Sequence, residues 1–215
     1  MKRVVIIGAG GHGREVADIL RARSETGVLG FVDDNREIHG NDVDGLRVLG
    51  DWSWFEGLDR SEIAVVCAVG SPQSCRRLTE RAESLGLSFA NAISPLAHIS
   101  AFARLGDGVT VFPHAVINTG AVVESYSILN IGATVSHDTK IGRYSNINPG
   151  VHLAGNVTVG EGCYIGMGAN VIQGRSVGAW SVVGAGAVVT RDIPARVTAV
   201  GVPAKIVKMR EGLDE

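Results

Sequence analysis

The sequence is poor in cysteine, in long apolar runs and in unbalanced charge. Its three cysteines, Cys67, Cys75 and Cys163, show no CxxC spacing, which argues against a disulfide framework or a zinc knuckle. No apolar run approaches the roughly 18 residues that a membrane-spanning helix needs. Lys and Arg number 20 against 22 Asp and Glu, so a nucleic-acid binder that relies on phosphate neutralisation is disfavoured. Residues 1–7 lack the apolar region and cleavage site of a signal peptide, so we expect a cytoplasmic protein.

Aromatic residues are also scarce, at 5%, while glycine is abundant, with 29 residues. A hydrophobic content of 45% with 20% charged residues is typical of a folded chain of one or two domains. In part of this chain, small residues must therefore fill the space that aromatic rings occupy in an ordinary core.

A six-residue period runs through the second half of the chain. Every sixth residue from Ile99 to Val189 is Ile, Leu or Val, sixteen positions in succession. Chance would produce this in one register about once in 10⁹. Four positions after each aliphatic, the residue is usually small or β-branched, and glycine often follows the aliphatic directly.

This period predicts a parallel β-helix. Ordinary sheets bury every second residue and helices have periods of three and four, so neither explains one anchor every six. Six residues form one short side, three sides close a coil of eighteen residues, and coils stack at about 4.8 Å. About five coils would form a narrow triangular prism with an aliphatic interior.

The first ninety residues predict an α/β nucleotide-binding unit. Buried strands are expected at residues 3–7, 28–32 and 63–69, with an amphipathic helix over 14–23. The glycines at 8, 10 and 13 satisfy G-x-G-x-x-G, with acidic residues about twenty positions on. Three interpretations stay open: a dinucleotide site, a site for another pyrophosphate such as that of a sugar nucleotide, and a plain tight turn. There is room for one mononucleotide-binding half only.

The hexads, which close with the segment 200–205 (VGVPAK), resemble those of the hexapeptide-repeat acyltransferases. The complete order, a GAGGHG loop, a small Rossmann-like domain and then hexads, resembles the NeuD/PglD-type sugar acetyltransferases over nearly all of residues 2–208. The resemblance implies a left-handed prism at residues 93–215, including a short C-terminal tail, after a Rossmann-like domain at residues 1–92. It also implies a homotrimer with acetyl-CoA bound between neighbouring prisms, no metal, and a role in bacterial surface glycan biosynthesis.

The segment 129–142 contains the candidate catalytic pair, His137 and Asp138. Acetyl transfer to an amine needs a base, and an imidazole, with an ordinary pKa of roughly 6.5, suits that task near neutral pH. The neighbouring carboxylate can orient the ring and raise its basicity. The resemblance places the family's catalytic histidine in this same setting. The alternative is a solvated surface histidine beside an acid.

Other roles rest on the resemblance alone. It implies that the sugar nucleotide contacts Gly10, Gly11, His12, Asp33, Asp34, Gly70 and Asn130. It implies acetyl-CoA contacts at Asn146, Gly155, Met167, Ala185 and Lys205, with the Gly155 N–H as a candidate oxyanion donor. The alternatives are a corner glycine at 155, prism wall at 167 and 185, and an ordinary exposed lysine at 205.

Two positions depart from the family pattern. Asn146 stands where many relatives have a second histidine, and it can donate a hydrogen bond but cannot share proton transfer. Gly70-Ser71-Pro72 replaces a G-N-N loop that contacts the nucleotide. The leading hypothesis is an acetyl-CoA-dependent N-acetyltransferase for a nucleotide-linked 4-amino-4,6-dideoxy sugar. O-acetylation of a sialic acid-type sugar and a non-catalytic nucleotide-sugar-binding scaffold are the alternatives.

Overall fold

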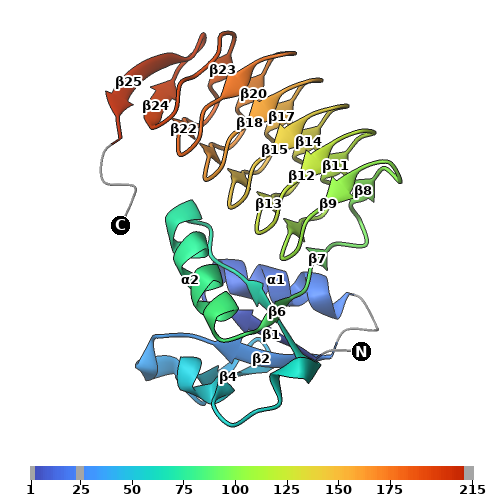
Figure 1. The fold of residues 1–215 in the computed structure, drawn as a ribbon, viewed down its shortest axis with the longest axis vertical. Helices are drawn as coiled ribbons and strands as arrows, with labels where there is room; N and C mark the ends of the chain where they lie inside the picture. Colours follow the sequence, from blue (N-terminus) through green and yellow to red (C-terminus); the bar gives the residue numbers. More distant parts are fainter. Residues whose placement is uncertain (1–2, 23–26, 211–215) are drawn as a thin grey trace.

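The computed structural model describes residues 3–22 and 27–210, which form an α/β part and a β-helix (Figure 1). The α/β part is built on one six-stranded sheet, in the order β3-β4-β2-β1-β5-β6. Its strands are β1 (Arg3–Ile7), β2 (Val28–Val32), β3 (Asp42–Val43), β4 (Leu46–Gly50), β5 (Ile63–Cys67) and β6 (Ser88–Phe89). All pairs are parallel except β3–β4.

Two helices cover opposite faces of this sheet, because side chains alternate along a strand. Val4 and Ile6 of β1 pack with α1 (Gly11–Arg21), whereas Val5 and Ile7 pack on the side of α2 (Pro72–Ser84). Short 3₁₀ segments lie after β2 (Arg36–Ile38), after β4 (Trp52–Phe55) and directly before β5 (Arg60–Glu62). Across the described ranges, neither helix has the length and apolar character needed to cross a membrane.

The predicted β-α-β order is confirmed, with different boundaries. The helix begins at Gly11 and not at residue 14, because the glycine loop itself supplies the first turn. The strand predicted over 63–69 ends at Cys67, since Ala68 to Ser71 turn into α2. The sequence prediction missed α2 and the β3–β4 pair.

The predicted β-helix is also confirmed. Strands of two residues pair in parallel with the strand eighteen residues later, as in Ile128 with Asn146. The first face contains β7 (Ala92–Ile93), β10 (Thr110–Val111), β13 (Ile128–Leu129), β16 (Asn146–Ile147), β19 (Tyr164–Ile165), β22 (Val182–Val183), β24 (Val197–Val200) and β25 (Lys205–Met209).

The second and third faces close each coil. The second contains β8 (His98–Ile99), β11 (Val116–Ile117), β14 (Thr134–Val135), β17 (His152–Leu153), β20 (Asn170–Val171) and β23 (Val188–Val189). The third contains β9 (Arg104–Leu105), β12 (Val122–Val123), β15 (Lys140–Ile141), β18 (Thr158–Val159) and β21 (Ser176–Val177). The aliphatic anchors of the hexads fill one continuous interior cluster, as the period predicts.

We name two corners of the prism by their residues. The histidine corner joins the second face to the third at residues 119–120, 137–138, 155–156 and 173–174. The aromatic corner joins the third face to the first at residues 125–126, 143–144, 161–162 and 179–180. The second residue of each of these turns has a left-handed backbone conformation, whether or not it is glycine. Its φ is 64° at Tyr126 and 59° at Asp138.

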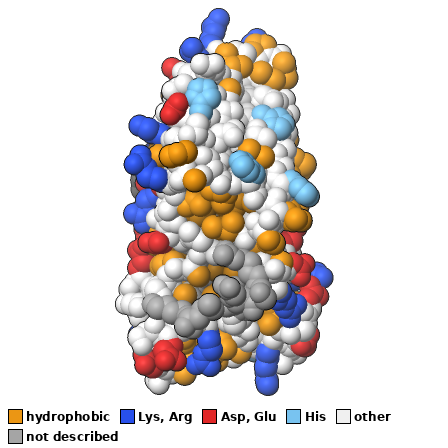
Figure 2. Space-filling view, turned by 90° about the vertical axis from the view of Figure 1, so that its right-hand side faces the viewer, with side chains coloured by type: hydrophobic (Ala, Val, Ile, Leu, Met, Phe, Trp, Pro, Cys, Tyr) orange, Lys and Arg blue, Asp and Glu red, His pale blue; other side chains and the backbone are white. Residues whose placement is uncertain are grey.

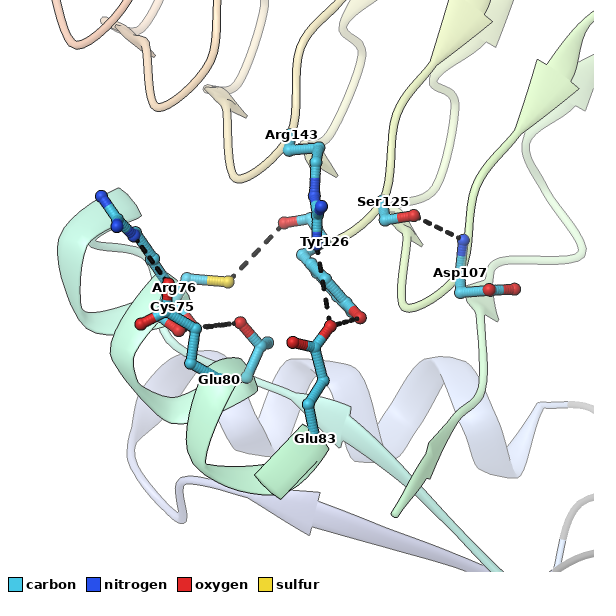
Figure 3. Close-up of polar contacts among 9 residues, drawn as sticks. Cys75, Arg76, Glu80, Glu83, Asp107, Ser125, Tyr126 and Arg143 are labelled. Atoms are coloured by element: carbon cyan, nitrogen blue, oxygen red, sulfur yellow. Dashed lines mark hydrogen bonds and ion pairs between the residues drawn. The ribbon is translucent and has the colours of Figure 1, made fainter. Parts of the chain in front are cut away.

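The α/β part docks on the aromatic corner through α2 (Figure 3). The Tyr126 hydroxyl donates to Glu83 at 2.6 Å, and Arg143 lies 3.7 Å from the same carboxylate. The Cys75 thiol donates to the backbone carbonyl of Tyr126 at 3.6 Å. All three cysteines are buried and free. The proposed domain boundary at 92/93 lies inside β7, and it stays a prediction.

Candidate functional site

The glycine loop between β1 and α1 is shaped by two of its glycines. Gly8 has a φ of 104°, which only glycine adopts readily, and a Cβ at Gly13 would overlap the carbonyl of Gly8. Helix and strand therefore approach too closely for any larger residue at position 13.

Gly10 and Gly11 have a different reason to be small. A Cβ at either position would meet nothing within 4 Å, so the protein's own packing does not require glycine there. Gly10 is the N-cap of α1, and no side chain caps the exposed N–H groups of the first turn. Free N–H groups at a helix N-terminus, with open space in front of them, suit a phosphate group.

The two acidic residues after β2 have separate surroundings. The carboxylate of Asp33 accepts hydrogen bonds from the Ala9 and Asn35 N–H groups, both at 2.8 Å, and so ties the glycine loop to the next loop. Asp34 is exposed and lies 3.9 Å from Arg81. A cavity of about 210 Å³ lies between them and α2, lined by Ile7, Gly8, Val32, Asp33, Asp34, Trp52, Val69, Ser74, Arg77 and Leu78.

His12 lies between the two parts of the chain. Its ring stacks on Phe112 of the β-helix, with 5.3 Å between the centroids, and its side chain is 18% exposed. Burial lowers the pKa of His12, which the nearby Glu15 offsets only in part. Its Nε2 is buried without a partner among the described residues.

Asn146, one of the two departures, contacts Gly70, which directly precedes the other at Ser71-Pro72. The Asn146 Nδ2 donates to the Gly70 carbonyl at 2.8 Å, from the β-helix to the loop before α2. The resemblance implies that Asn146 contacts acetyl-CoA. In the structure its side chain contacts the loop that is predicted to bind the nucleotide.

The predicted catalytic pair forms the hydrogen bond that its sequence suggested. His137 Nδ1 lies 2.9 Å from Asp138 Oδ2, and the two side chains are 50% and 61% exposed. The bond leaves Nε2 as the nitrogen free to accept a proton. The left-handed φ of Asp138 turns its carboxylate back toward the preceding side chain. Figure 2 shows that histidine side chains gather on this side of the β-helix.

Gly155 lies one coil above His137 and against its ring. A Cβ added there would overlap Nε2 and would lie 2.5 Å from Cε1. The left-handed residue of this turn is Asn156, with a φ of 58°, so the backbone does not demand glycine at 155. Glycine is needed there to leave room for the imidazole, a reason that neither predicted interpretation of Gly155 included.

The remaining predicted contacts lie on several sides of one chain. The Asn130 side chain accepts a hydrogen bond from the Ile131 N–H at 2.8 Å, at the end of the first face. Met167 and Ala185 lie exposed at the corner between the first and second faces, and Lys205 lies exposed in β25. No described hydrogen bond, ion pair or ring contact joins His137 or Asp138 to residues 3–92. One chain therefore does not gather all of the predicted residues at one place.

Sequence reasoning missed three features of these surroundings. Phe112 stacks on His12, Arg81 lies over the ring of Trp52 at 4.6 Å, and an aromatic column covers one corner. A signal existed for the column: Tyr126, Tyr144 and Trp180 occupy one phase of the eighteen-residue repeat. No comparable periodic signal marked the other two. Within the described part of the chain, no group of three or more potential ligands could hold a metal ion.

Comparisons with known proteins agree with this geometry. The PglD N-terminal domain matches residues 3–82. The crystal structure of PerB from Caulobacter crescentus, in complex with CoA and GDP-perosamine, is 40% identical, with a TM-score of 0.90 over 97% of this chain and 98% of that one. The chain belongs to the NeuD/PglD-type sugar acetyltransferase family.

Two further relatives extend the likeness within this NeuD/PglD-type family. The acetyltransferase domain of PglB from Neisseria gonorrhoeae is 37% identical, with a TM-score of 0.91 over 96% of this chain and all of that one. The curated UDP-N-acetylbacillosamine N-acetyltransferase of Bacillus subtilis is 36% identical over 123 residues, which is about half of each protein (52% and 51%). The prism is accordingly the left-handed β-helix of these acetyltransferases.

Proposed function

We propose that this protein transfers the acetyl group of acetyl-CoA to the amino group of a nucleotide-linked amino sugar. The observation that carries the proposal is the His137–Asp138 pair on an exposed corner, with Nε2 facing the bare backbone of Gly155. Solved relatives that share the fold from end to end are described in complex with CoA and GDP-perosamine or with acetyl-CoA.

In the proposed reaction, His137 acts as the general base. The sugar amine attacks the thioester carbonyl carbon, a C–N bond forms, and the C–S bond breaks. Nε2 of His137 accepts the proton that the amine loses and returns it to the departing thiolate of CoA. Asp138 holds the Nδ1–H tautomer through its 2.9 Å contact and stabilises the imidazolium. The Gly155 N–H, for which no described residue is the acceptor, is the proposed donor to the developing oxyanion.

The sugar nucleotide is proposed to bind the α/β part, residues 1–92, and acetyl-CoA the prism, residues 93–215. Support comes from the open space at Gly10 and Gly11, the free N–H groups of α1 and the adjoining cavity beside Asp34. We place the reaction in the cytoplasm, because acetyl-CoA and sugar nucleotides are made there.

We further propose that the complete site forms between chains of a homotrimer. No described hydrogen bond, ion pair or ring contact joins His137 to residues 3–92 of its own chain, while acetyl transfer needs its base and its amine together. Packing three prisms about a threefold axis would bring the histidine corner of one chain to the nucleotide loop of its neighbour. Sedimentation should give about 67 kDa, three chains of 22.5 kDa.

A thiol-release assay tests the activity directly. Acetyl-CoA is offered with a panel of nucleotide-linked 4-amino sugars on UDP, dTDP and GDP, and with free sialic acid. Release of CoA with one amino sugar supports N-acetylation. Turnover with sialic acid alone would identify the protein as an O-acetyltransferase, and no turnover with any acceptor would favour the binding scaffold.

Mixed trimers test the shared site. Gly155 and His137 touch within one chain, so variants at these two positions cannot complement each other. His137→Ala chains should instead be mixed with Gly11→Val chains, each of which contributes what the other lacks. Recovery of activity on mixing supports the shared site, and a fully active monomer would rule it out.

The nucleotide loop has its own test. A side chain at position 11 would project into open space, so Gly11→Val should fold normally. It should raise KM for the sugar nucleotide at least about 10-fold and leave KM for acetyl-CoA nearly unchanged. Tight NADH binding by the wild-type protein would instead favour the dinucleotide interpretation.

A further inference from the structure

The surroundings of Asn146 indicate a role other than stabilising the fold. Its side chain reaches from β16 to the loop before α2, and the residue is only 4% exposed. Nδ2 donates to the Gly70 carbonyl at 2.8 Å, but Oδ1 is buried and has no partner among the described residues. A flipped amide would set two acceptor oxygens against each other, so this donor must face Gly70. An unmet buried acceptor is unfavourable, and an apolar side chain of that size would avoid it.

The bond to Gly70 determines where the next N–H points. In a trans peptide the carbonyl and the N–H lie in one plane and point in opposite directions, and the Gly70–Ser71 bond is trans. Asn146 holds the carbonyl on the β-helix side, so the Ser71 N–H points away from the β-helix. That N–H has no acceptor among the described residues.

Ser71 lies where a phosphate would be met. It is the N-cap of α2, a helix of thirteen residues whose first turn has no acidic residue. Val69, two residues before Ser71, and Ser74, three residues after it, line the 210 Å³ cavity that also reaches Gly8 and Asp34. The Ser71 hydroxyl caps the Ser74 N–H at 3.4 Å and Pro72 has no N–H, so the Ser71 N–H is the donor that this loop can offer to a ligand beside the glycine loop.

We propose that Asn146 is a positioning residue for the sugar nucleotide. By holding the Gly70 carbonyl, it directs the Ser71 N–H toward the diphosphate of the bound nucleotide, and it makes no contact with acetyl-CoA. This inference rests on the proposed function for its ligand class. It also gives the two departures from the family pattern, Asn146 and Gly70-Ser71-Pro72, one shared explanation.

Direct binding separates this role from catalysis. Isothermal titration with GDP, UDP and dTDP alone, and separately with CoA, is applied to the wild type, Asn146→Leu and Asn146→His. Asn146→Leu should raise Kd for the preferred nucleoside diphosphate at least about 10-fold and leave Kd for CoA within about twofold. Asn146→His retains an N–H donor for Gly70, so its Kd should stay within about threefold of the wild type.

A control variant accounts for general loss of stability. The buried Ser181 donates a hydrogen bond to the Pro194 carbonyl at 2.8 Å, within the β-helix and far along the chain from residue 146. Ser181→Ala should lower the melting temperature and leave both Kd values unchanged. Asn146→Leu should show the reverse, a melting temperature close to the wild type with weaker nucleotide binding.

Several outcomes would overturn the proposal. Two concern Asn146→Leu: normal nucleotide binding, or a loss of CoA binding alone. The others are an Asn146→His protein that binds nucleotide as weakly as Asn146→Leu, and a wild type that binds none of the three diphosphates. Nucleotide binding that depends on Asn146, in a protein that transfers no acetyl group, would refute the proposed function and leave this inference standing.

Discussion

The histidine corner and the aromatic corner share one backbone conformation and differ in what surrounds them. Each turn places a residue in the left-handed region, with φ of 59° and 58° at Asp138 and Asn156 and of 64° and 60° at Tyr126 and Trp180. Asp and Asn tolerate this conformation well, whereas large aromatics rarely adopt it. At the aromatic corner, the side chains lie 6% and 7% exposed beneath α2. At the histidine corner, the side chains face solvent.

The difference shows how one repeat supports two roles. The aliphatic anchors and parallel strands are common to both corners, so the side chains of the turns are free to vary without loss of the coil. Aromatic burial against α2 compensates for the strained turn at one corner. At the other, the turn brings a carboxylate to an imidazole, and the absence of a Cβ at Gly155 leaves room for the ring.

The largest expected effect is at His137. His137→Ala should lower kcat by about 10² to 10⁴, the usual range for loss of a general base, with little change in melting temperature because the side chain is half exposed. Steady-state kinetics with both substrates saturating measure this. Asp138→Asn should cost less, since asparagine tolerates the same φ and the imidazole remains. Near-normal turnover of His137→Ala would show that this corner is not the catalytic one.

Tyr126 provides the opposite test at the aromatic corner. Tyr126→Ala removes a ring that packs 4.7 Å from Phe89 and 5.4 Å from Tyr144, and should lower the free energy of unfolding by about 3 to 5 kcal/mol. Urea unfolding measures this loss, and kcat of the folded fraction should stay within about threefold. Tyr126→Phe keeps the packing and should lose only about 1 kcal/mol with the Glu83 hydrogen bond. A stable Tyr126→Ala protein that has lost kcat would invert the roles of the two corners.

Gly155 sharpens the comparison within the histidine corner. Gly155→Ala creates no strained backbone but displaces the imidazole, so kcat should fall about 10- to 100-fold. The control is Gly86→Ala, which lies outside the β-helix with a φ of 70° and open space around it. That variant should lose about 1 kcal/mol of stability and no kcat. Equal kinetics for the two variants would contradict the steric role of Gly155.

The smallest effect is a pH dependence that arises outside both corners, at His12. Burial holds the pKa of His12 below that of an unfolded imidazole, so the unfolded chain takes up a proton that the folded chain resists. His12 therefore contributes its full stability above about pH 6.5, and the contribution declines as the pH falls below that value. Urea unfolding at pH 7.5 and pH 5 should show this decline reduced in His12→Gln, by on the order of 1 kcal/mol or less. An unchanged decline would mean that other groups dominate acid unfolding.

Features that depend on neighbours in the chain were predictable from the sequence. The six-residue period determines the coil, because each anchor packs on the equivalent residue eighteen positions away and the same contact repeats. The glycine loop follows from local backbone needs at Gly8 and Gly13. His137 and Asp138 are adjacent, and one turn conformation is enough to bring their side chains together.

Tertiary structure alone decided what lies across the junction of the two parts. His12 stacks on Phe112, Asn146 binds Gly70 and α2 covers one corner. These contacts join residues that are more than 40 positions apart in the chain. Such contacts depend on how one folded surface docks on another, and no local period or propensity encodes that orientation. For the same physical reason, the sequence determined which side chain could act as the base. Docking of the two parts left that side chain without a described hydrogen bond, ion pair or ring contact to the glycine loop of its own chain.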